Sequence, residues 1–213
     1  IGTDKGLGCF NPADSSLRYF THVPSDRSSL SNDKVRSLLQ DRRGDIYVGT
    51  RGGGLNVFDE RTRSFVRYTK ENGLPENTIS GMLEDARGKI WMATNSGMVK
   101  FNPETRGFIH YYNEVIQSVG VFHSHAYLKT RAGRFLFGGN GVLSFYPDSI
   151  RDDLSFPPVV ITSFAVLGKE IRDYVRNGES VSIPWENNYF SFEFAALEYH
   201  EPRKIQYAYM LEG

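Results

Sequence analysis

The sequence has a single cysteine, Cys9, among its 213 residues, and it has no net charge, because 25 Lys and Arg residues balance 25 Asp and Glu residues. One thiol excludes an intrachain disulfide and a cysteine-based zinc site. Zero net charge argues against a dedicated binder of nucleic acids or anionic membranes, which would need a basic face. No apolar run approaches the roughly 20 residues that a membrane-spanning helix needs.

Aromatic residues and glycine are abundant. Phe, Tyr and Trp make up 14% of the chain, and the 21 glycines suit a fold with many tight turns. Hydrophobic residues at 39% and charged residues at 23% are typical of a folded protein, so the composition argues against disorder. The chain begins at Ile1 inside a repeated pattern, and we expect it to be a piece of a longer protein.

Similar segments begin near Val35, Ile79 and His125. Their turn glycines are 44 and 45 residues apart, at Gly44, Gly88 and Gly133. The first 20 residues match the segment from Val48 to Tyr68, so they represent the end of another unit. A period of about 44 residues with four strands in each unit is typical of the blades of a β-propeller.

Each unit contains short apolar segments that we expect to be strands. They are Val35–Gln40, Ile46–Thr50, Leu55–Phe58 and Phe65–Tyr68, then Ile79–Glu84, Ile90–Thr94, Met98–Phe101 and Phe108–Tyr112, then Phe135–Gly138 and Val142–Phe145. Residues 31–41 contain helix formers, but they align with a strand of the next unit, which favours a strand. The last unit lacks a fourth strand, which we expect upstream sequence to supply. We therefore predict an all-β fold in which residues 1–156 form the C-terminal blades of a β-propeller, with about three and a half four-stranded blades.

The pair Glu84 and Asp85 could suggest acid–base catalysis, but a structural explanation is stronger. Asp85 and Gly88 stand at the first and fourth positions of a tight turn, where Asp accepts hydrogen bonds from the backbone and Gly adopts a left-handed conformation. Glu84 aligns with Gln40, which cannot act as an acid or a base. We therefore predict no catalytic residues here.

Equivalent strands carry small residues at one position, namely Gly49, Ala93 and Gly138. These strands are apolar on both faces, and we expect the small residues to allow close packing between blades. Trp91 lies within one of these strands, so we expect it in the core. Cys9 also lies on a strand, and we expect it to be a small buried residue.

The period ends at Pro157, and residues 157–213 form a second region. Short strands are expected there at Val159–Val166, Ser180–Ile183, Tyr189–Ala195 and Ile205–Leu211. This pattern suggests an immunoglobulin-like β-sandwich. Because a complete domain of that kind has roughly 100 residues, we expect the sandwich to be truncated.

Two stretches resemble a known family. LEDARGKIWMATNSGMVKFNPETRGFIHY, from Leu83, is similar to the two-component-regulator propeller repeat. PPVVITSFAVLGKEI together with KIQYAYMLEG, at the C-terminus, resembles the start of the three-tyrosine (Y_Y_Y) domain that follows such propellers. The pairing resembles the sensor region of hybrid two-component systems, which are common in Bacteroides-type bacteria.

The resemblance implies a periplasmic sensor that recognises glycan-derived oligosaccharides and signals across the inner membrane. In the family, propellers and the Y_Y_Y domain precede a membrane helix, a histidine kinase, a receiver and a DNA-binding domain. The chain itself carries no kinase motif, so we expect it not to be an enzyme, although its parent would be a histidine kinase. No cofactor is implied. The expected partners are an oligosaccharide and a second copy of the chain, joined through incomplete blade edges; no contact with nucleic acid or membrane is expected.

A ligand of a propeller would meet the loops of one rim, which connect the fourth strand to the next blade and the second strand to the third. Arg and Asn side chains in such loops offer several donors to sugar hydroxyls, and a free Trp can stack on a sugar ring. Solvated turn residues are the competing explanation at each position. The candidates for ligand binding are Arg51, Asn77, Asn95, His123, His125, Asn140 and Trp185.

Two further patterns point to chemistry only weakly. Residues 49–54 are rich in glycine, but no helix and no Lys-Ser/Thr pair follows them, so a phosphate-binding loop is disfavoured. His123 and His125 could share one face of a strand as half of a metal site, but loop histidines are the simpler interpretation. We therefore predict no metal site.

Three functions remain open from the sequence. The first is a non-catalytic sensor fragment, as the resemblance implies. The second is a propeller-fold enzyme of the lyase or glycosidase type, which would need a cluster of acids or a metal at the rim. The third is a scaffold or dimerisation module, in which the second region joins two chains.

Overall fold

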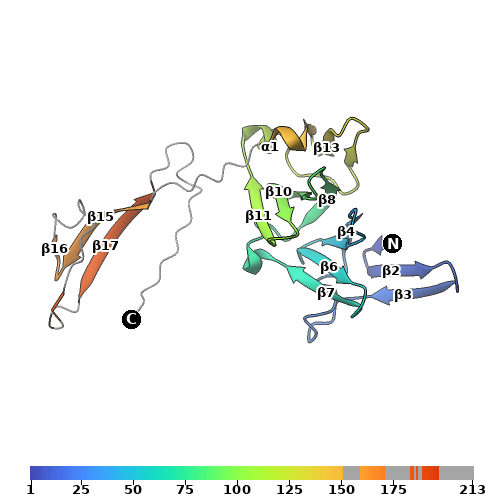
Figure 1. Ribbon diagram of the computed structural model, residues 1–213, viewed down its shortest axis with the longest axis horizontal. Coiled ribbons are helices and arrows are strands. Elements are labelled where there is room, and N and C mark those ends of the chain that lie inside the picture. The colour runs from blue at the N-terminus through green and yellow to red at the C-terminus, as the bar shows by residue number, and fades with distance from the viewer. Residues whose placement is uncertain (151–158, 171–182, 185, 187–188, 197–213) are drawn as a thin grey trace. The chain divides into compact units, whose positions relative to one another are not determined.

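The computed structural model describes residues 1–150, 159–170, 183–184, 186 and 189–196 (Figure 1). The chain divides into two compact units, Ile1–Asp152 and Asp153–Gly213. The boundary expected at Pro157 and the strand expected at Ile205–Leu211 lie outside the described residues. Of the strand expected at Ser180–Ile183, the described residues include only Ile183, and Ile183 is not part of a strand.

The first unit consists of four successive antiparallel sheets, which we call blades 1 to 4 (Figure 1). Their strands are β1 (Gly2–Thr3), β2 (Gly6–Asn11) and β3 (Ser16–Phe20); β4 (Val35–Gln40), β5 (Ile46–Thr50), β6 (Leu55–Asp59) and β7 (Ser64–Tyr68); β8 (Ile79–Glu84), β9 (Ile90–Thr94), β10 (Gly97–Asn102) and β11 (Gly107–Tyr111); β12 (Tyr127–Lys129), β13 (Phe135–Gly138) and β14 (Val142–Phe145). Blades 2 and 3 have four strands, and blades 1 and 4 have three. The predicted all-β fold and its blades are confirmed.

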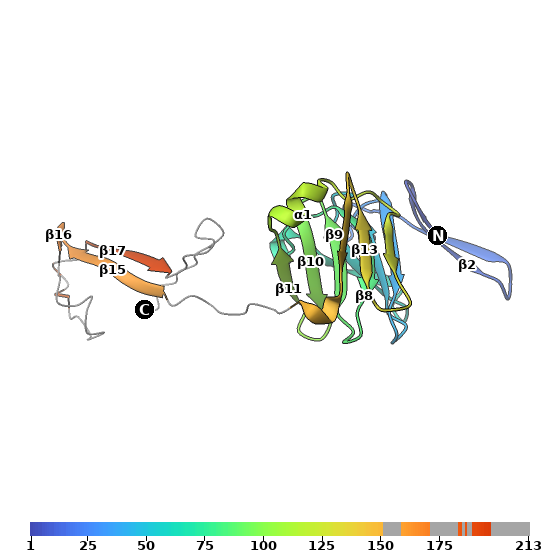
Figure 2. The same ribbon diagram turned by 90° about the horizontal axis from the view of Figure 1, so that it is seen from above.

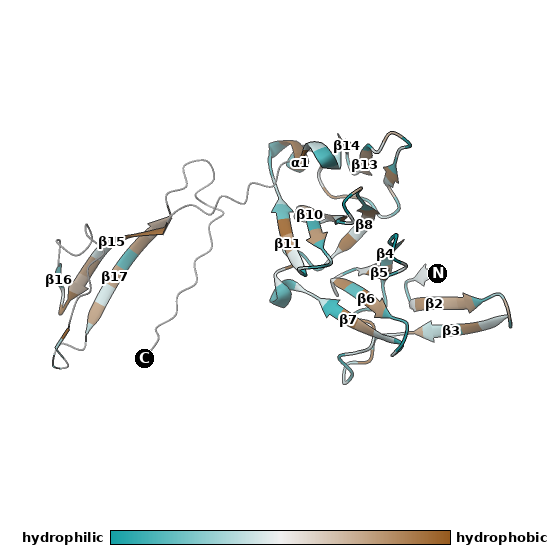
Figure 3. Ribbon diagram, viewed as in Figure 1, coloured by the Kyte–Doolittle hydropathy of each residue, from teal (hydrophilic) through white to brown (hydrophobic). Residues whose placement is uncertain are grey.

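The cores lie between blades, and hydrophobic residues follow the strands (Figure 3). Leu7, Val48 and Phe65 pack between blades 1 and 2. Tyr47 and Phe101 belong to the cluster between blades 2 and 3. A third cluster joins blades 3 and 4, whose sheets lie face to face when seen from above (Figure 2). Each blade therefore depends on its neighbours for the burial of its apolar faces.

Small residues make this packing possible, as predicted. A Cβ atom on Gly49 would lie 2.3 Å from Ser37 Oγ and 2.8 Å from Ile79 Cγ2 of the next blade. A Cβ atom on Gly2 would lie 2.6 Å from Val35 Cγ1, which again belongs to the next blade. The equivalent residue of blade 3, Ala93, is 1% exposed. Blades 1 and 2 thus each present a notch to the inner strand of the blade that follows, whereas a Cβ atom on Gly138 would meet only Ala126 of its own blade.

The turn aspartates are buried, and they tie the first strand of a blade to the second. Asp85 Oδ1 accepts hydrogen bonds from the backbone of Arg87 and Lys89 at 2.8 and 2.9 Å, and its Oδ2 accepts one from Trp91 Nε1 at 2.9 Å. Trp91 is 2% exposed, so its expected place in the core is confirmed. The structural explanation of Asp85 therefore holds.

Blade 2 repeats this arrangement with a tyrosine. Asp41 accepts bonds from the backbone of Arg43 and Asp45, and the Tyr47 hydroxyl donates to Asp41 Oδ2 at 3.3 Å. Burial, together with the nearby Asp41 carboxylate, raises the pKa of Tyr47 well above its usual value. In blade 4, Thr130 replaces the turn aspartate, and its Oγ1 accepts a hydrogen bond from the backbone N–H of Arg134 at 3.0 Å.

The sequence pattern predicted no helix, but the α-helix α1 (Glu114–Val119) lies in the connection between blades 3 and 4. Asn113 caps it by accepting a hydrogen bond from the backbone of Ile116 at 2.9 Å, and Gly120 follows its last residue. Short 3-10 turns also occur at Lys70–Asn72 and Pro147–Ser149. None of the described helices is long and apolar enough to cross a membrane.

The second unit contains one described sheet in the order β16-β15-β17, formed by β15 (Val159–Val166), β16 (Lys169–Glu170) and β17 (Phe190–Ala196). The expected strand at Val159–Val166 is confirmed, and the one expected at Tyr189–Ala195 occurs one residue later. A sandwich needs a second sheet, which is not among the described residues, so the immunoglobulin-like sandwich stays a prediction.

Candidate functional site

The rim loops bring Arg51 and Asn77 together. The backbone N–H groups of Gly52 and Gly54 donate to the Asn77 carbonyl at 3.0 and 2.7 Å, and the backbone of Arg51 pairs with that of Thr78 in an isolated antiparallel β-bridge. The Asn77 side chain is also engaged, because its Oδ1 accepts from the Lys70 backbone at 2.9 Å. Arg51 is exposed, which leaves its side chain accessible from the rim.

Backbone hydrogen bonds also join the segment that contains His123 to the loop that contains Asn140. The His123 backbone donates to Gly138 at 2.9 Å, and the Asn140 backbone donates to Val119 at 2.8 Å. Both side chains are exposed. The loop between β13 and β14 is therefore held against the connection that contains α1.

His123 and His125 precede β12 and lie in a turn, so the two imidazoles do not share a strand face. His125 adopts a left-handed conformation with φ of 65°, which breaks the alternation that a strand would provide. It lines a cavity of about 180 Å³ beside Val35, Leu38 and Tyr127. Among the described residues, no group of three or more metal-ligating side chains is close enough to hold an ion.

The remaining candidates are isolated. Asn95 is exposed at the turn between β9 and β10, where the neighbouring Ser96 carbonyl contacts His110 Nε2 at 2.8 Å. Trp185 lies outside the described residues. The structure thus pairs Arg51 with Asn77 and places His123 near the loop of Asn140, while nothing in it gathers all the candidates around one cavity.

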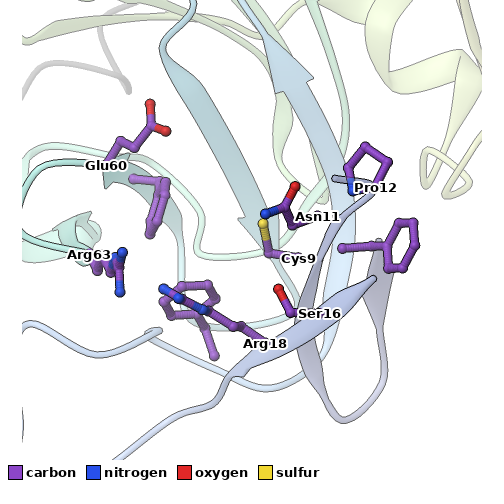
Figure 4. Close-up of a pocket in the computed structure, with 10 residues that line it drawn as sticks. Cys9, Asn11, Pro12, Ser16, Arg18, Glu60 and Arg63 are labelled. Carbon is purple, nitrogen blue, oxygen red and sulfur yellow. The ribbon is translucent and has the colours of Figure 1, made fainter. Parts of the chain in front are cut away.

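A larger groove lies between blades 1 and 2, and we call it the interblade groove (Figure 4). Its volume is about 510 Å³, and the residues that matter for its chemistry are Cys9, Arg18, Phe20, Phe58, Glu60 and Arg63. Cys9 is exposed there, so its expected burial is wrong. The reason is that its side of the β2–β3 hairpin borders the groove and not a packed core.

The sequence analysis missed Arg18 and Arg63. Strand register provides the signal that could have found the first. Arg18 pairs with Cys9 in blade 1 as Val66 pairs with Val57 in blade 2, so an arginine occupies a position that is apolar in the next repeat. Reading each repeat against the others at this position would have marked Arg18 as a departure.

Comparison with known proteins agrees with these blades. The family model for the two component regulator propeller matches residues 29–52 and 73–96, which cover the first two strands of blades 2 and 3 and the loops beside them. The histidine kinase P4 of Formosa agariphila is 27% identical over the whole chain, which corresponds to 16% of that protein.

Two solved structures from B. thetaiotaomicron have a similar fold. Both are described as extracellular domains of proteins assigned as hybrid two component systems, BT3049 and BT4673. The first is 23% identical with a TM-score of 0.50 over 92% of this chain and 33% of its own. The second is 15% identical with a TM-score of 0.58 over 91% of this chain and 39% of its own.

The chain spans 16% of the length of the curated relative and 33% and 39% of the lengths of these two domains. The chain therefore has two segments that match the two component regulator propeller family, is similar over its whole length to part of a histidine kinase, and shares the fold of extracellular domains assigned to hybrid two-component systems.

Proposed function

We propose that this chain is part of the extracytoplasmic sensor region of a hybrid two-component histidine kinase and response regulator. Its blades would contribute to the recognition of glycan-derived oligosaccharides in the periplasm, and the unit after them would pass the signal toward the membrane. The observation that carries this proposal is the similarity to a histidine kinase over the whole chain, combined with repeats of the regulator propeller type.

The geometry supports recognition and not catalysis. Backbone hydrogen bonds hold the loops that carry Arg51 and Asn140, and the side chains of Arg51, Asn95 and Asn140 are exposed. Such side chains offer donors and acceptors that match sugar hydroxyls, and a fixed backbone lowers the entropic cost of binding. We infer that the chain acts by binding a ligand.

Titration calorimetry of the extracellular region that contains this chain, against a panel of glycan oligosaccharides, tests the proposal. We expect at least one oligosaccharide to bind, and replacing Arg51 with alanine to weaken that binding if the rim is the site. Failure of every member of the panel to bind would contradict oligosaccharide sensing.

We also propose that copies of the chain associate head to tail through their end faces. Leu128 and Val142 of blade 4 are 56% and 68% exposed, whereas Leu55, which occupies the position of Val142 in blade 2, is fully buried under the next blade. Ile1 and Phe10 of blade 1 are 76% and 54% exposed. Their equivalents in blade 2, Val48 and Phe58, pack against the preceding blade. The exposed face of blade 4 thus corresponds to the surface that a blade buries against the next blade. The exposed face of blade 1 corresponds to the surface that a blade buries against the preceding one.

Replacing Val142 with lysine should therefore reduce association, because a charge would have to lose its water inside an apolar contact. Multi-angle light scattering of the chain over a range of concentrations measures the effect. Val115→Lys is the matched control, since Val115 is 65% exposed on α1 and belongs to none of the strands of blade 4. A chain that stays monomeric at high concentration would contradict the proposal.

A further inference from the structure

Two arginines point into the interblade groove with no acid between them. Arg18 belongs to β3 and Arg63 to the turn between β6 and β7, and Figure 4 shows their guanidinium groups converging while the Glu60 carboxylate points away. Neither guanidinium has an ion-pair or hydrogen-bond partner among the described residues. Two cations brought together without a counter-charge repel each other, and an anion between them removes that repulsion.

The repeat shows that blade architecture does not require this pair. Arg63 has a left-handed backbone with φ of 54°, and the equivalent turn of blade 3 has Arg106 with φ of 59°, so the two four-stranded blades share an arginine here, whereas blade 1 has Ser15 with φ of 55°. Arg18 is different, because the same strand position holds Val66 in blade 2 and Ile109 in blade 3. An apolar residue would fit the blade, and Arg18 adds a charge where the repeat has none.

The surroundings of the two arginines suit a sugar. Guanidinium groups bind carboxylate and sulfate oxygens through paired, charge-assisted hydrogen bonds. Phe20 and Phe58 line the same groove as partly exposed aromatic side chains against which a sugar ring can pack. The groove volume of about 510 Å³ lies in the range of small-ligand sites.

We propose that the interblade groove binds the acidic group, a carboxylate or a sulfate, of an acidic oligosaccharide. This inference rests on the proposed function, because it specifies the class of saccharide that the sensor would recognise. Arg18 and Arg63 would hold the acidic group, and the aromatic side chains would contact the sugar ring that bears it.

The test compares charged and neutral forms of one sugar. The full chain is titrated by NMR, following the Arg Nε–H signals, with tri-galacturonate, with its fully methyl-esterified form, and with a 6-sulfated galactose oligosaccharide. The variants are Arg18→Val, which restores the residue of the next repeat, and Arg63→Asn, which tolerates a left-handed backbone. Arg106→Asn is the matched control, because it changes the equivalent turn of blade 3.

We expect at least one acidic ligand to shift the Arg18 and Arg63 signals, and the neutral ester to bind about tenfold more weakly or not at all. Arg18→Val and Arg63→Asn should each weaken acidic binding about tenfold or more, and Arg106→Asn should not change it. The stronger of the two acidic ligands identifies the acidic group.

Equal binding of the acid and its ester, or unchanged acidic binding in Arg18→Val, would overturn the groove assignment and leave oligosaccharide sensing intact. Failure of both acidic ligands to bind the wild-type chain would also overturn it. The proposed function would fail separately, only if the extracellular region bound no member of its full panel, neutral sugars included.

Discussion

Replacing Gly49 with valine is expected to separate blades 2 and 3 and to lower the free energy of unfolding by about 3 kcal/mol or more. The new Cβ atom would lie 2.3 Å from Ser37 Oγ and 2.8 Å from Ile79 Cγ2, and valine adds two methyl groups beyond it. The Ser37 hydroxyl, which donates to the Ile79 carbonyl at 3.1 Å, would lose its place, so the hydrogen bond between the blades would be lost as well.

Urea denaturation followed by circular dichroism measures this effect. Gly141→Val is the matched control, because a Cβ atom there would meet no heavy atom within 4 Å and the expected change is within about 0.5 kcal/mol. A Gly49→Val chain that unfolds at the same urea concentration as Gly141→Val would show that the blades do not pack through this notch.

Replacing Asp85 with alanine is expected to lower the free energy of unfolding by about 2–4 kcal/mol, because it leaves several donors without their acceptor. The backbone groups of Arg87 and Lys89 can turn to water, but Trp91 Nε1 is buried and cannot. The loss should therefore exceed that of an ordinary turn aspartate. Urea denaturation followed by circular dichroism measures the loss in every variant.

Asp59→Ala is the matched control for Asp85→Ala. Asp59 also accepts hydrogen bonds from two backbone groups of its turn, at 2.9 and 3.2 Å, but no buried side chain donates to it. We expect its loss to cost about 1 kcal/mol or less. Each substitution is also made in a Trp91→Phe chain, which has no buried indole donor. In that chain we expect Asp85→Ala to cost less free energy of unfolding than in the wild type, and Asp59→Ala to cost the same. Equal losses in Asp59→Ala and Asp85→Ala would contradict the role of the buried indole.

The blades were predictable because the same constraints act several times. The turn with Asp85 and Gly88 repeats that of Asp41 and Gly44, and both glycines have a positive φ, so the alignment of repeats located the strand ends closely. The helix α1 was missed because the equivalent connections contain no α-helix: residues 21–34 form a loop, and the connection between blades 2 and 3 contains only the 3-10 turn Lys70–Asn72. Its signals, Asn113 and Gly120, also occur in ordinary turns, so no repeat could reinforce them.

The candidate site was less predictable. Sequence placed Arg51 and Asn77 on one rim, and the backbone contacts there agree, but the exposure of Cys9 and the position of Arg18 and Arg63 in one groove depend on how two blades face each other. Arg18 comes from one blade and Arg63 from another, about 45 residues later, so periodicity within a strand carries no information about whether they line the same groove.

We propose that this chain belongs to an oligosaccharide sensor. Titration calorimetry of the extracellular region that contains it tests this most directly, with the acidic and neutral members of the glycan panel measured under one set of conditions. We expect saturable binding of at least one oligosaccharide. Heats no larger than those of dilution for every saccharide in the panel would contradict it.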